Sequence, residues 1–355
     1  MRNNIKFLGL VLVLALVLPF SGVLAQDGEE IELEPVDPLA YEGDIAIAGS
    51  STVEPVTIAM AERFAEAGFT GNISVAETGT SAGFERFCTE GSTDLSNASR
   101  PIRDSEVEAC EAIGRTPLAF KIGTDAITVA VSVENDFVTE LKRSELVAIF
   151  TGEATMWADV REGWPEEGIE LFTPGTDSGT FDFFGEAVLG DDGIYSERSA
   201  RFDALLAPNP TTSENDFVLV EGIQGSPYAI GYFGFAYYVE NQDTLNAVAI
   251  ADDIYFDDDE NVMVVDEADW EAEGVEYVAP TQETAESGDY MLSRPLFIYS
   301  AASIMAEKPQ VAAFVSYYLS NANEVVAEVG YFPASLETIN ASKQLFLDAA
   351  AEIEG

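Results

Sequence analysis

The chain has 355 residues, of which 47% are apolar, enough for two domains of ordinary size with their own cores. Its formal charge of −48 repels nucleic acid and anionic lipid at long range, so we expect no nucleic acid as a partner. The chain contains no histidine, which excludes Ser-His-Asp and Cys-His catalysis and histidine-based metal sites. We interpret nearly all of the acidic residues as a solvated surface.

The N-terminus has the pattern of a secretory signal peptide over residues 1–25. Arg2 and Lys6 form a basic start, residues 7–19 form an apolar core, and residues 23–25 fit a cleavage site. A membrane anchor is the alternative interpretation, but the apolar core is short and ends in the cleavage site. We therefore expect an exported protein that is periplasmic or otherwise extracytoplasmic.

The mature chain is expected to start with an acidic lead-in, residues 26–43. Its composition and two prolines predict a disordered or loosely held segment. Regular structure is predicted to begin with an alternating strand at 44–49. The turn Ser50-Ser51-Thr52 follows, and then a helix whose apolar residues recur every four positions from Val56 to Phe64.

This order of strand, hydroxyl-rich turn and helix start occurs four times. The turns are residues 49–53, 78–83, 98–102 and 175–180. The free N–H groups and the dipole of a helix start favour an anion, and glycine lets the backbone approach a ligand closely. Ligands of an open α/β sheet bind at the carboxyl ends of its strands. We therefore expect the four turns to meet at one anion site.

The chain has two cysteines, Cys88 and Cys110. In an exported protein a single pair of cysteines predicts a disulfide, because the compartment is oxidising. Such a bond closes a loop of roughly 23 residues and contributes on the order of 3 kcal/mol to stability in the chain-entropy model.

The segment 251–276 is dense in acids and predicts a solvated insertion. A calcium-binding EF-hand is the alternative, and it needs Gly at its sixth position and Glu at its twelfth. This pattern is absent when counted from Asp253, Asp257 or Asp258. We therefore expect no metal site in this segment.

Six motifs together resemble the phosphate-binding solute receptors of ABC transporters. The motifs are Gly49-Ser50-Ser51-Thr52-Val53, Gly79-Thr80-Ser81-Ala82-Gly83, Asn97-Ala98-Ser99-Arg100-Pro101-Ile102, Gly175-Thr176-Asp177-Ser178-Gly179-Thr180, Ala229-Ile230-Gly231-Tyr232-Phe233 and Ser293-Arg294-Pro295-Leu296-Phe297-Ile298-Tyr299. The resemblance covers the segments 44–250 and 277–345, which is most of the mature chain. The insertion 251–276 has no counterpart in it.

The resemblance implies an α/β fold of the two-lobed type 2 periplasmic binding protein class, also called a Venus-flytrap. Two α/β sheets would be joined by two crossover segments, with the ligand in the cleft. Lobe one would comprise 44–122 and 295–355, and lobe two would comprise 123–294. The expected protein is a monomeric, non-enzymatic receptor without a cofactor, which binds inorganic phosphate and delivers it to the membrane permease subunits of an ABC importer.

Carried over position by position, the resemblance assigns anion contacts to both lobes. The expected contacts are Thr52, Val53 and Thr80 with Ser99 and Arg100 in lobe one, and Ser178, Gly179 and Thr180 in lobe two. The alternative for Arg100 is a surface ion pair with one of the many acids. For Arg294 an anion contact is the alternative, and we interpret this residue as an ion pair at the lobe junction rather than as a ligand of the anion.

Two positions depart from the family pattern. Pro174 occupies the place of a frequent Arg in lobe two, and Arg100 occupies the place of a frequent Asp in lobe one. The positive charge is therefore predicted to lie on lobe one, where a guanidinium can still bind a tetrahedral oxyanion. In the usual pattern the Asp accepts a proton from phosphate and so rejects sulfate. Here Asp177 or Glu77 is the candidate acceptor.

Three other functions fit parts of the sequence. A receptor for another tetrahedral oxyanion, such as sulfate, tungstate or molybdate, would use the same turns. An aspartic-type hydrolase would use Asp177-Ser178-Gly179-Thr180, but such enzymes need two aspartates that share a proton, and the chain has one copy of the motif. A structural or adhesive surface protein fits the acidic composition alone. We therefore predict the phosphate receptor.

Overall fold

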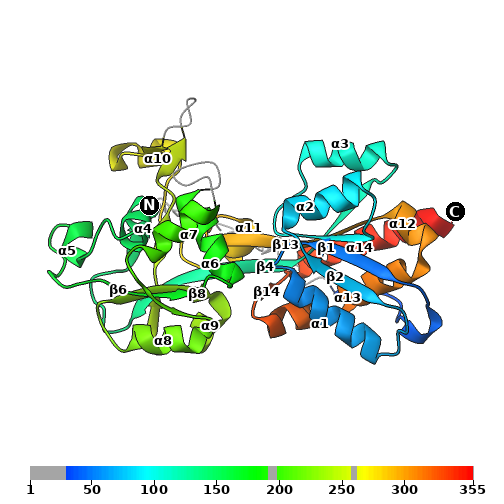
Figure 1. Ribbon diagram of the computed structural model, residues 1–355, viewed down its shortest axis with the longest axis horizontal. Helices are drawn as coiled ribbons and strands as arrows, with labels where there is room; N and C mark the ends of the chain where they lie inside the picture. Colours follow the sequence, from blue (N-terminus) through cyan, green and yellow to red (C-terminus); the bar gives the residue numbers. More distant parts are fainter. Residues whose placement is uncertain (1–28, 191–197, 257–261, 355) are drawn as a thin grey trace, which may run out of the picture.

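The computed structural model describes residues 29–190, 198–256 and 262–354. The chain forms two α/β lobes that lie side by side (Figure 1). Two long strands, β4 (Pro117–Ser132) and β13 (Ser293–Ala301), run between the lobes. The predicted two-lobed α/β fold is confirmed.

One sheet runs through both lobes because β4 has partners in each of them. The lobe-one strands are β1 (Ile45–Gly49), β2 (Ile73–Glu77), β3 (Leu95–Ala98) and the short β14 (Phe332–Pro333). The lobe-two strands are β6 (Glu170–Pro174), β7 (Thr211–Ser213), β8 (Ala229–Gly234) and the short β9 (Leu245–Ala247). The order along the sheet is β2-β1-β3-β13-β4-β8-β6-β7, in which β1, β2 and β3 are parallel to each other, as are β6, β7 and β8.

The helices of lobe one cover both faces of its half of the sheet. They are η1 (Pro38–Ala40), α1 (Glu54–Glu66), α2 (Thr80–Phe84) with the π-helical turn η2 (Glu85–Thr89), α3 (Asp104–Ala112), α12 (Ala302–Glu307), α13 (Pro309–Val329) and α14 (Leu336–Glu354). Helices α1 and α13 lie on one side of the strands, and α2 and α3 lie on the other (Figure 1). Val56, Met60 and Phe64 of α1 are fully buried, as their spacing predicts.

Lobe two has the same layered plan. Its helices are α4 (Arg143–Phe150), α5 (Trp157–Val160), α6 (Gly179–Phe184) with the π-helical turn η3 (Gly185–Leu189), α7 (Arg198–Leu206), α8 (Asp216–Gln224), α9 (Phe235–Glu240) and α11 (Gln282–Ser287), with a small parallel sheet of β5 (Glu140–Lys142) and β10 (Ala249–Ala251). The rings of Phe184 and Tyr232 are stacked, with centroids 3.7 Å apart. This stack fixes α6 on strand β8.

The lead-in differs from the prediction of a disordered segment, because residues 29–43 are packed on lobe one. The backbone N–H of Ile31 donates to the Asn340 side chain at 2.7 Å, and Glu30 forms an ion pair with Lys343 at 2.6 Å. The Lys343 side chain is 3% exposed, and burying such a charge without a partner is costly. One acid of the lead-in therefore has a structural role that composition does not show. The predicted signal peptide lies outside the described residues.

The predicted disulfide between Cys88 and Cys110 is present. Both cysteines are buried, and the bond joins η2 to α3. Helix α2 leads directly into η2, and Arg100 lies just before α3, so the disulfide connects two elements that follow predicted anion-binding turns.

The acidic insertion is attached to lobe two, and its acids from Asp266 to Glu276 are exposed, as the prediction of a solvated segment expects. Its described part forms β11 (Ile254–Phe256) antiparallel to β12 (Val262–Val264), then η4 (Glu267–Asp269) and α10 (Trp270–Glu273). Asp253 is fully buried and accepts hydrogen bonds from the backbone N–H and the hydroxyl of Ser144. Asp257 and Asp258 lie outside the described residues.

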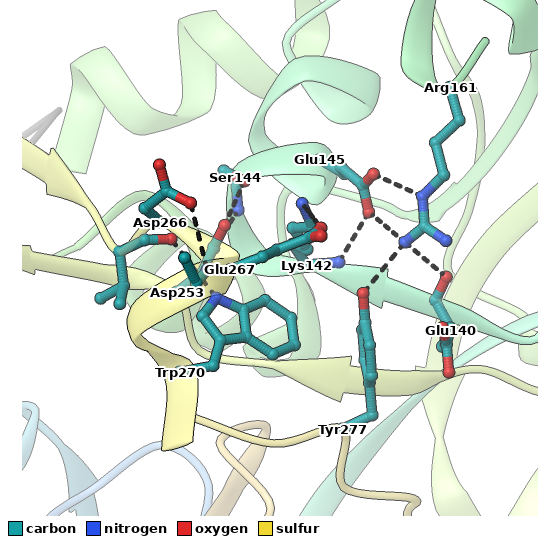
Figure 2. A network of polar contacts seen from close by, with 12 residues as sticks. Glu140, Lys142, Ser144, Glu145, Arg161, Asp253, Asp266, Glu267, Trp270 and Tyr277 are labelled. Carbon is teal, nitrogen blue, oxygen red and sulfur yellow. Dashed lines mark hydrogen bonds and ion pairs between the residues drawn. The ribbon is translucent and has the colours of Figure 1, made fainter. Parts of the chain in front are cut away.

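Cationic side chains of lobe two hold this segment in place (Figure 2). Lys142 forms an ion pair with Glu267 and lies 5.7 Å from the ring centroid of Trp270. Arg161, which is bonded to a glutamate of α4, also donates to the Tyr277 hydroxyl at 3.3 Å. Glu267 of the insertion thus pairs with Lys142 of lobe two, a contact that the composition does not predict.

Replacing both cysteines, Cys88→Ser with Cys110→Ser, is expected to lower the free energy of unfolding by on the order of 3 kcal/mol, because the unfolded chain loses a cross-link. Urea denaturation followed by circular dichroism measures the change. The wild-type protein under reducing conditions is the control and should approach the variant. Equal midpoints and slopes for the variant and the oxidised wild type would show that the cross-link contributes nothing.

Candidate functional site

A cavity of about 540 Å³ lies between the lobes, where three of the predicted lobe-one turns face the start of α6. Its lining comprises Ser50, Ser51, Thr52, Thr78, Gly79, Thr80, Ser81, Ala82, Ser99, Arg100 and Arg103 from lobe one, Gly179, Asp182, Phe183 and Glu186 from lobe two, and Arg294 from β13. The lobe-one turns follow the carboxyl ends of β1, β2 and β3, which is where a ligand of an α/β sheet binds.

The first turn presents a hydroxyl that has no partner. Thr52 is 2% exposed, and its Oγ1 has no hydrogen-bond partner among the described residues, although it lines the cavity. Its backbone N–H donates to Ser50 Oγ at 3.2 Å. Val53 is fully buried at the start of α1. Other buried hydroxyls also lack a partner in the described part of the chain, but Thr52 is the one among them that lines this cavity.

The second and third turns are hydrogen-bonded to each other. Thr80 Oγ1 lies 3.1 Å from Ser99 Oγ and accepts from the Ser99 backbone N–H at 3.2 Å. A Cβ atom on Gly83 would lie 2.5 Å from the Gly49 backbone, so only glycine lets α2 pack this closely on β1. Three predicted contacts, Thr52, Thr80 and Ser99, are therefore brought to one wall of the cavity.

Arg100 lines the cavity, and its guanidinium is held by an acid. Its two terminal nitrogens donate to the two carboxylate oxygens of Glu106 at 2.9 and 2.7 Å, and Nη2 also donates to Ser81 at 3.0 Å. Burial favours a higher pKa for Glu106, but these bonds hold its pKa below the usual value. Arg100 thus forms the ion pair that was the alternative interpretation from the sequence, and it also lines the cavity.

The lobe-two turn contributes less to this cavity than the resemblance implies. Gly179 lines it, whereas Ser178 and Thr180 do not, and Ser178 Oγ caps α6 by accepting from the Thr180 backbone N–H at 3.2 Å. The candidate proton acceptors Asp177 and Glu77 are exposed and lie outside the lining.

Several lining residues were not predicted as contacts. Asp182 and Glu186 bring acids to the cavity from lobe two, and each has an arginine nearby: Arg198 lies 3.0 Å from Asp182, and Arg201 lies 3.9 Å from Glu186. Asp182 and Glu186 are four positions apart, and this helical spacing after the turn could have predicted that both acids lie on the cavity side of α6 and η3. Their pairing with arginines of α7 is tertiary and has no local signal.

Arg294 is the third arginine of the cavity, after Arg100 and Arg103. Its ion pair at the lobe junction is confirmed, because Nε donates to Asp125 Oδ2 at 2.9 Å. The Ser-Arg-Pro motif marked this position in the sequence, but nothing local to the motif indicates that the side chain also reaches the cavity.

Acidic side chains also lie close to the first residue of the lobe-two turn. A Cβ atom on Gly175 would lie 1.7 Å from Glu214 Oε1, the end of a flexible and exposed side chain, so Gly175 leaves room for this carboxylate. Burial and the charge of Glu214 together raise the pKa of Asp216 to about 6. The turn therefore lies in a negative environment that an anion can tolerate only with local positive charge.

Two further findings bear on the class of protein. Among residues 29–190, 198–256 and 262–354, no group of three or more acidic or cysteine side chains is arranged to hold a metal ion. Within the same ranges, no helix has the length and apolar character needed to cross a membrane.

Two lobes, two crossing strands and a polar cavity between them define a solute-binding protein of the periplasmic type. The family model described as a PBP superfamily domain matches residues 37–322. The chain is 38% identical over 314 residues to the protein SphX of Synechocystis, covering 87% of this chain and 84% of the relative. It is 34% identical over 290 residues to the phosphate-binding protein PstS of Staphylococcus epidermidis, with 82% and 78% covered.

A solved structure supports the same assignment. The crystal structure of a possible phosphate binding protein from Planctomyces limnophilus is 35% identical, with a TM-score of 0.73, and the match covers 87% of this chain and 99% of that one. This chain therefore belongs to the PstS-like family of phosphate-binding proteins within the PBP superfamily, a family of receptors rather than enzymes.

Thr52→Val is expected to leave the free energy of unfolding of the ligand-free protein unchanged or to raise it by up to about 1 kcal/mol, because the lost hydroxyl has no partner among the residues that the structure describes. Urea denaturation measures this. Thr57→Val is the matched control, since the buried Thr57 hydroxyl bonds Asn97 and Tyr318, each at 3.1 Å. The control should lose about 1–3 kcal/mol. An equal loss in both variants would show that Thr52 is bonded within the protein.

Asp216→Asn is expected to stabilise the protein at neutral and higher pH. The folded pKa of Asp216, about 6, lies above the unfolded value of about 3.9, so its ionisation in the folded state costs stability as pH rises through about 6. Removing the charge should raise the free energy of unfolding by about 1–2 kcal/mol above that pH, after allowance for screening, and by nothing below about pH 4.

Denaturation of the Asp216→Asn variant across this pH range measures the difference from wild type. The exposed Asp243→Asn controls for the change in net charge. A benefit that is the same at every pH would contradict this account.

Proposed function

We propose that this protein binds inorganic phosphate in the cleft outside the cytoplasm and delivers it to the membrane permease of an ABC importer. The observation that carries the proposal is the buried hydroxyl of Thr52, which has no partner in the described part of the chain and lines the same cavity as Thr80, Ser99 and Arg100. The relatives named as phosphate-binding proteins support the same ligand.

The local charge of the cavity favours an anion even though the whole chain carries −48. Arg100, Arg103 and Arg294 line the cavity, against Asp182 and Glu186, in a chain with 16 basic and 64 acidic residues. Charges beyond about 8 Å are largely screened at physiological salt. Hydrogen bonds to a charged group contribute about 1.5–3 kcal/mol each before the costs of binding, so a few of them offset the repulsion that remains.

The contacts proposed for phosphate combine hydroxyls, backbone N–H groups and guanidinium donors. The proposed lobe-one contacts are Thr52 and Val53 at the start of α1, Thr80 at the start of α2, and Ser99 with Arg100 after β3. Ser178, Gly179 and Thr180 at the start of α6 would complete the shell if the lobes approach each other further. Closure of this kind is how two-lobed receptors respond to a ligand.

The alternative is a receptor for another tetrahedral oxyanion such as sulfate, tungstate or molybdate. Phosphate carries a proton near neutral pH and sulfate does not, so discrimination needs an acceptor at the site. Asp177 and Glu77 would have to move inward to serve, whereas Asp182 and Glu186 already line the cavity. Competition between phosphate and sulfate separates the two functions.

The proposed setting is extracytoplasmic, after export by the signal peptide and its cleavage. We infer that the receptor acts as a monomer, since one chain contains both walls of the site. Its partner is the permease, which would bind the loaded receptor and release phosphate into its own path.

Calorimetric titration of the mature chain, residues 26–355, with inorganic phosphate tests the proposal. We expect one-to-one binding that sulfate does not compete with, and a loss of affinity of about 10–100-fold in Arg100→Ala, because one charged hydrogen-bonding group is removed. Competition by sulfate would favour the general oxyanion receptor. Heat from neither anion, with the protein folded by circular dichroism, would overturn the proposal.

A further inference from the structure

Arg294 occupies the point where the crossing strands, the lobe-two turn and the cavity meet. It is the second residue of β13 and faces Asp125 of β4 in the antiparallel register. Its Nε donates to Asp125 Oδ2 at 2.9 Å, and its Nη2 donates to the Gly179 carbonyl at 3.3 Å. A single guanidinium therefore connects the lobe junction with the first residue of α6, and both Arg294 and Gly179 line the cavity.

The orientation of this guanidinium is set before any ligand binds. Its Cζ lies 4.1 Å from the ring centroid of Phe183, so the ring and the two hydrogen bonds hold it from different directions. The Arg294 side chain is 12% exposed and that of Asp125 is 3% exposed. A planar guanidinium held in this way loses little further rotational freedom when it forms another hydrogen bond.

One nitrogen of Arg294 is left for a ligand. A guanidinium has five N–H donors, and Asp125 and Gly179 engage Nε and Nη2. Within the described part of the chain, Nη1 has no hydrogen-bond acceptor. Arg100 differs, because both of its terminal nitrogens are bonded to Glu106, so it must exchange one of these bonds to bind the proposed anion.

Lobe two needs a cation from outside its own turn. The turn 175–180 contains no basic residue, and Pro174 precedes it. Asp182 and Glu186 are the charged residues that lobe two presents to the cavity, and Arg198 and Arg201, which lie beside them, do not line it. An anion enclosed between the lobes would therefore meet repulsion from this wall unless a positive group lies beside Gly179.

We propose that Arg294 supplies that group: its Nη1 donates to an oxygen of the bound anion while Asp125 and the Gly179 carbonyl hold the rest of the guanidinium. This rests on the proposed function, since the anion is the proposed phosphate. Arg294 is thus an anion-binding residue contributed by the lobe junction, and Asp125 is its positioning residue.

Calorimetric titration of the mature chain with inorganic phosphate tests the role of Arg294. Arg294→Gln is expected to bind about 10–100-fold more weakly than wild type, because one charge-assisted hydrogen bond is lost. Arg294→Lys keeps the charge but cannot span the three partners, so its affinity is expected to lie between those two. Arg63→Gln is the matched control, because Arg63 pairs with Glu324 and Glu328 outside the cavity, and its affinity should equal that of wild type.

A second readout separates binding from structural support. Affinity is measured on both sides of the second ionisation of phosphate, where the ligand is mainly the monoanion or mainly the dianion. Loss of a cation that touches the ligand weakens binding of the dianion more, so the preference of Arg294→Gln for the dianion should fall. A mere distortion of the cavity would weaken binding of both forms alike.

Because Arg294→Gln leaves Asp125 buried without its partner, the double variant Asp125→Asn with Arg294→Gln is measured as well. It restores stability without restoring the guanidinium, and it should keep the weak binding and the reduced dianion preference. Wild-type affinity and dianion preference in the folded double variant would overturn this inference alone. Failure of the wild-type protein to bind phosphate would instead overturn the proposed function.

Discussion

The structure depends on strand β4, whose 16 residues belong to both lobes. The strand pairs with β13 over its first part and with β8 and β9 over its second, so neither lobe completes its sheet without it. Buried backbone groups must be hydrogen-bonded, so the pairing of β4 with strands of both lobes keeps the lobes attached. The lobe surfaces outside this pairing remain free to form a cleft. Asp125 lies where the pairing passes from one lobe to the other, and its partner Arg294 faces the cavity.

The anion site proposed for so acidic a protein requires local geometry to outweigh net charge. Acids near the cavity are paired with arginines: Glu106 with Arg100, and Asp182 with Arg198. Pairing lowers the field of each acid at short range, and salt screens the distant ones. What remains beside the cavity is a set of hydroxyls, helix starts and guanidinium groups, which are the donors that a dehydrated oxyanion needs.

The sequence was informative wherever the chemistry is local. A strand end followed by glycine, hydroxyls and a helix start is a pattern of adjacent residues, and it correctly located the turns that carry Thr52, Thr80 and Ser99. Composition was a poorer guide. It predicted a loose lead-in, but Glu30 pairs with the buried Lys343, and it did not show that Glu267 of the exposed insertion pairs with Lys142 of lobe two.

By itself the sequence determined the strands, helix starts and hydroxyl-rich turns, because periodicity, capping and turn residues act between neighbours in the chain. The single pair of cysteines predicted the disulfide, and the resemblance to phosphate-binding receptors implied the two-lobed fold. Only the tertiary structure decided which of those turns share a wall, that Ser178 caps its own helix, and that Arg294 reaches the cavity from the lobe junction. The physical reason is that these facts depend on strand register and on contacts across more than a hundred residues, such as Arg294 with Asp125 and Gly179, for which no local pattern exists.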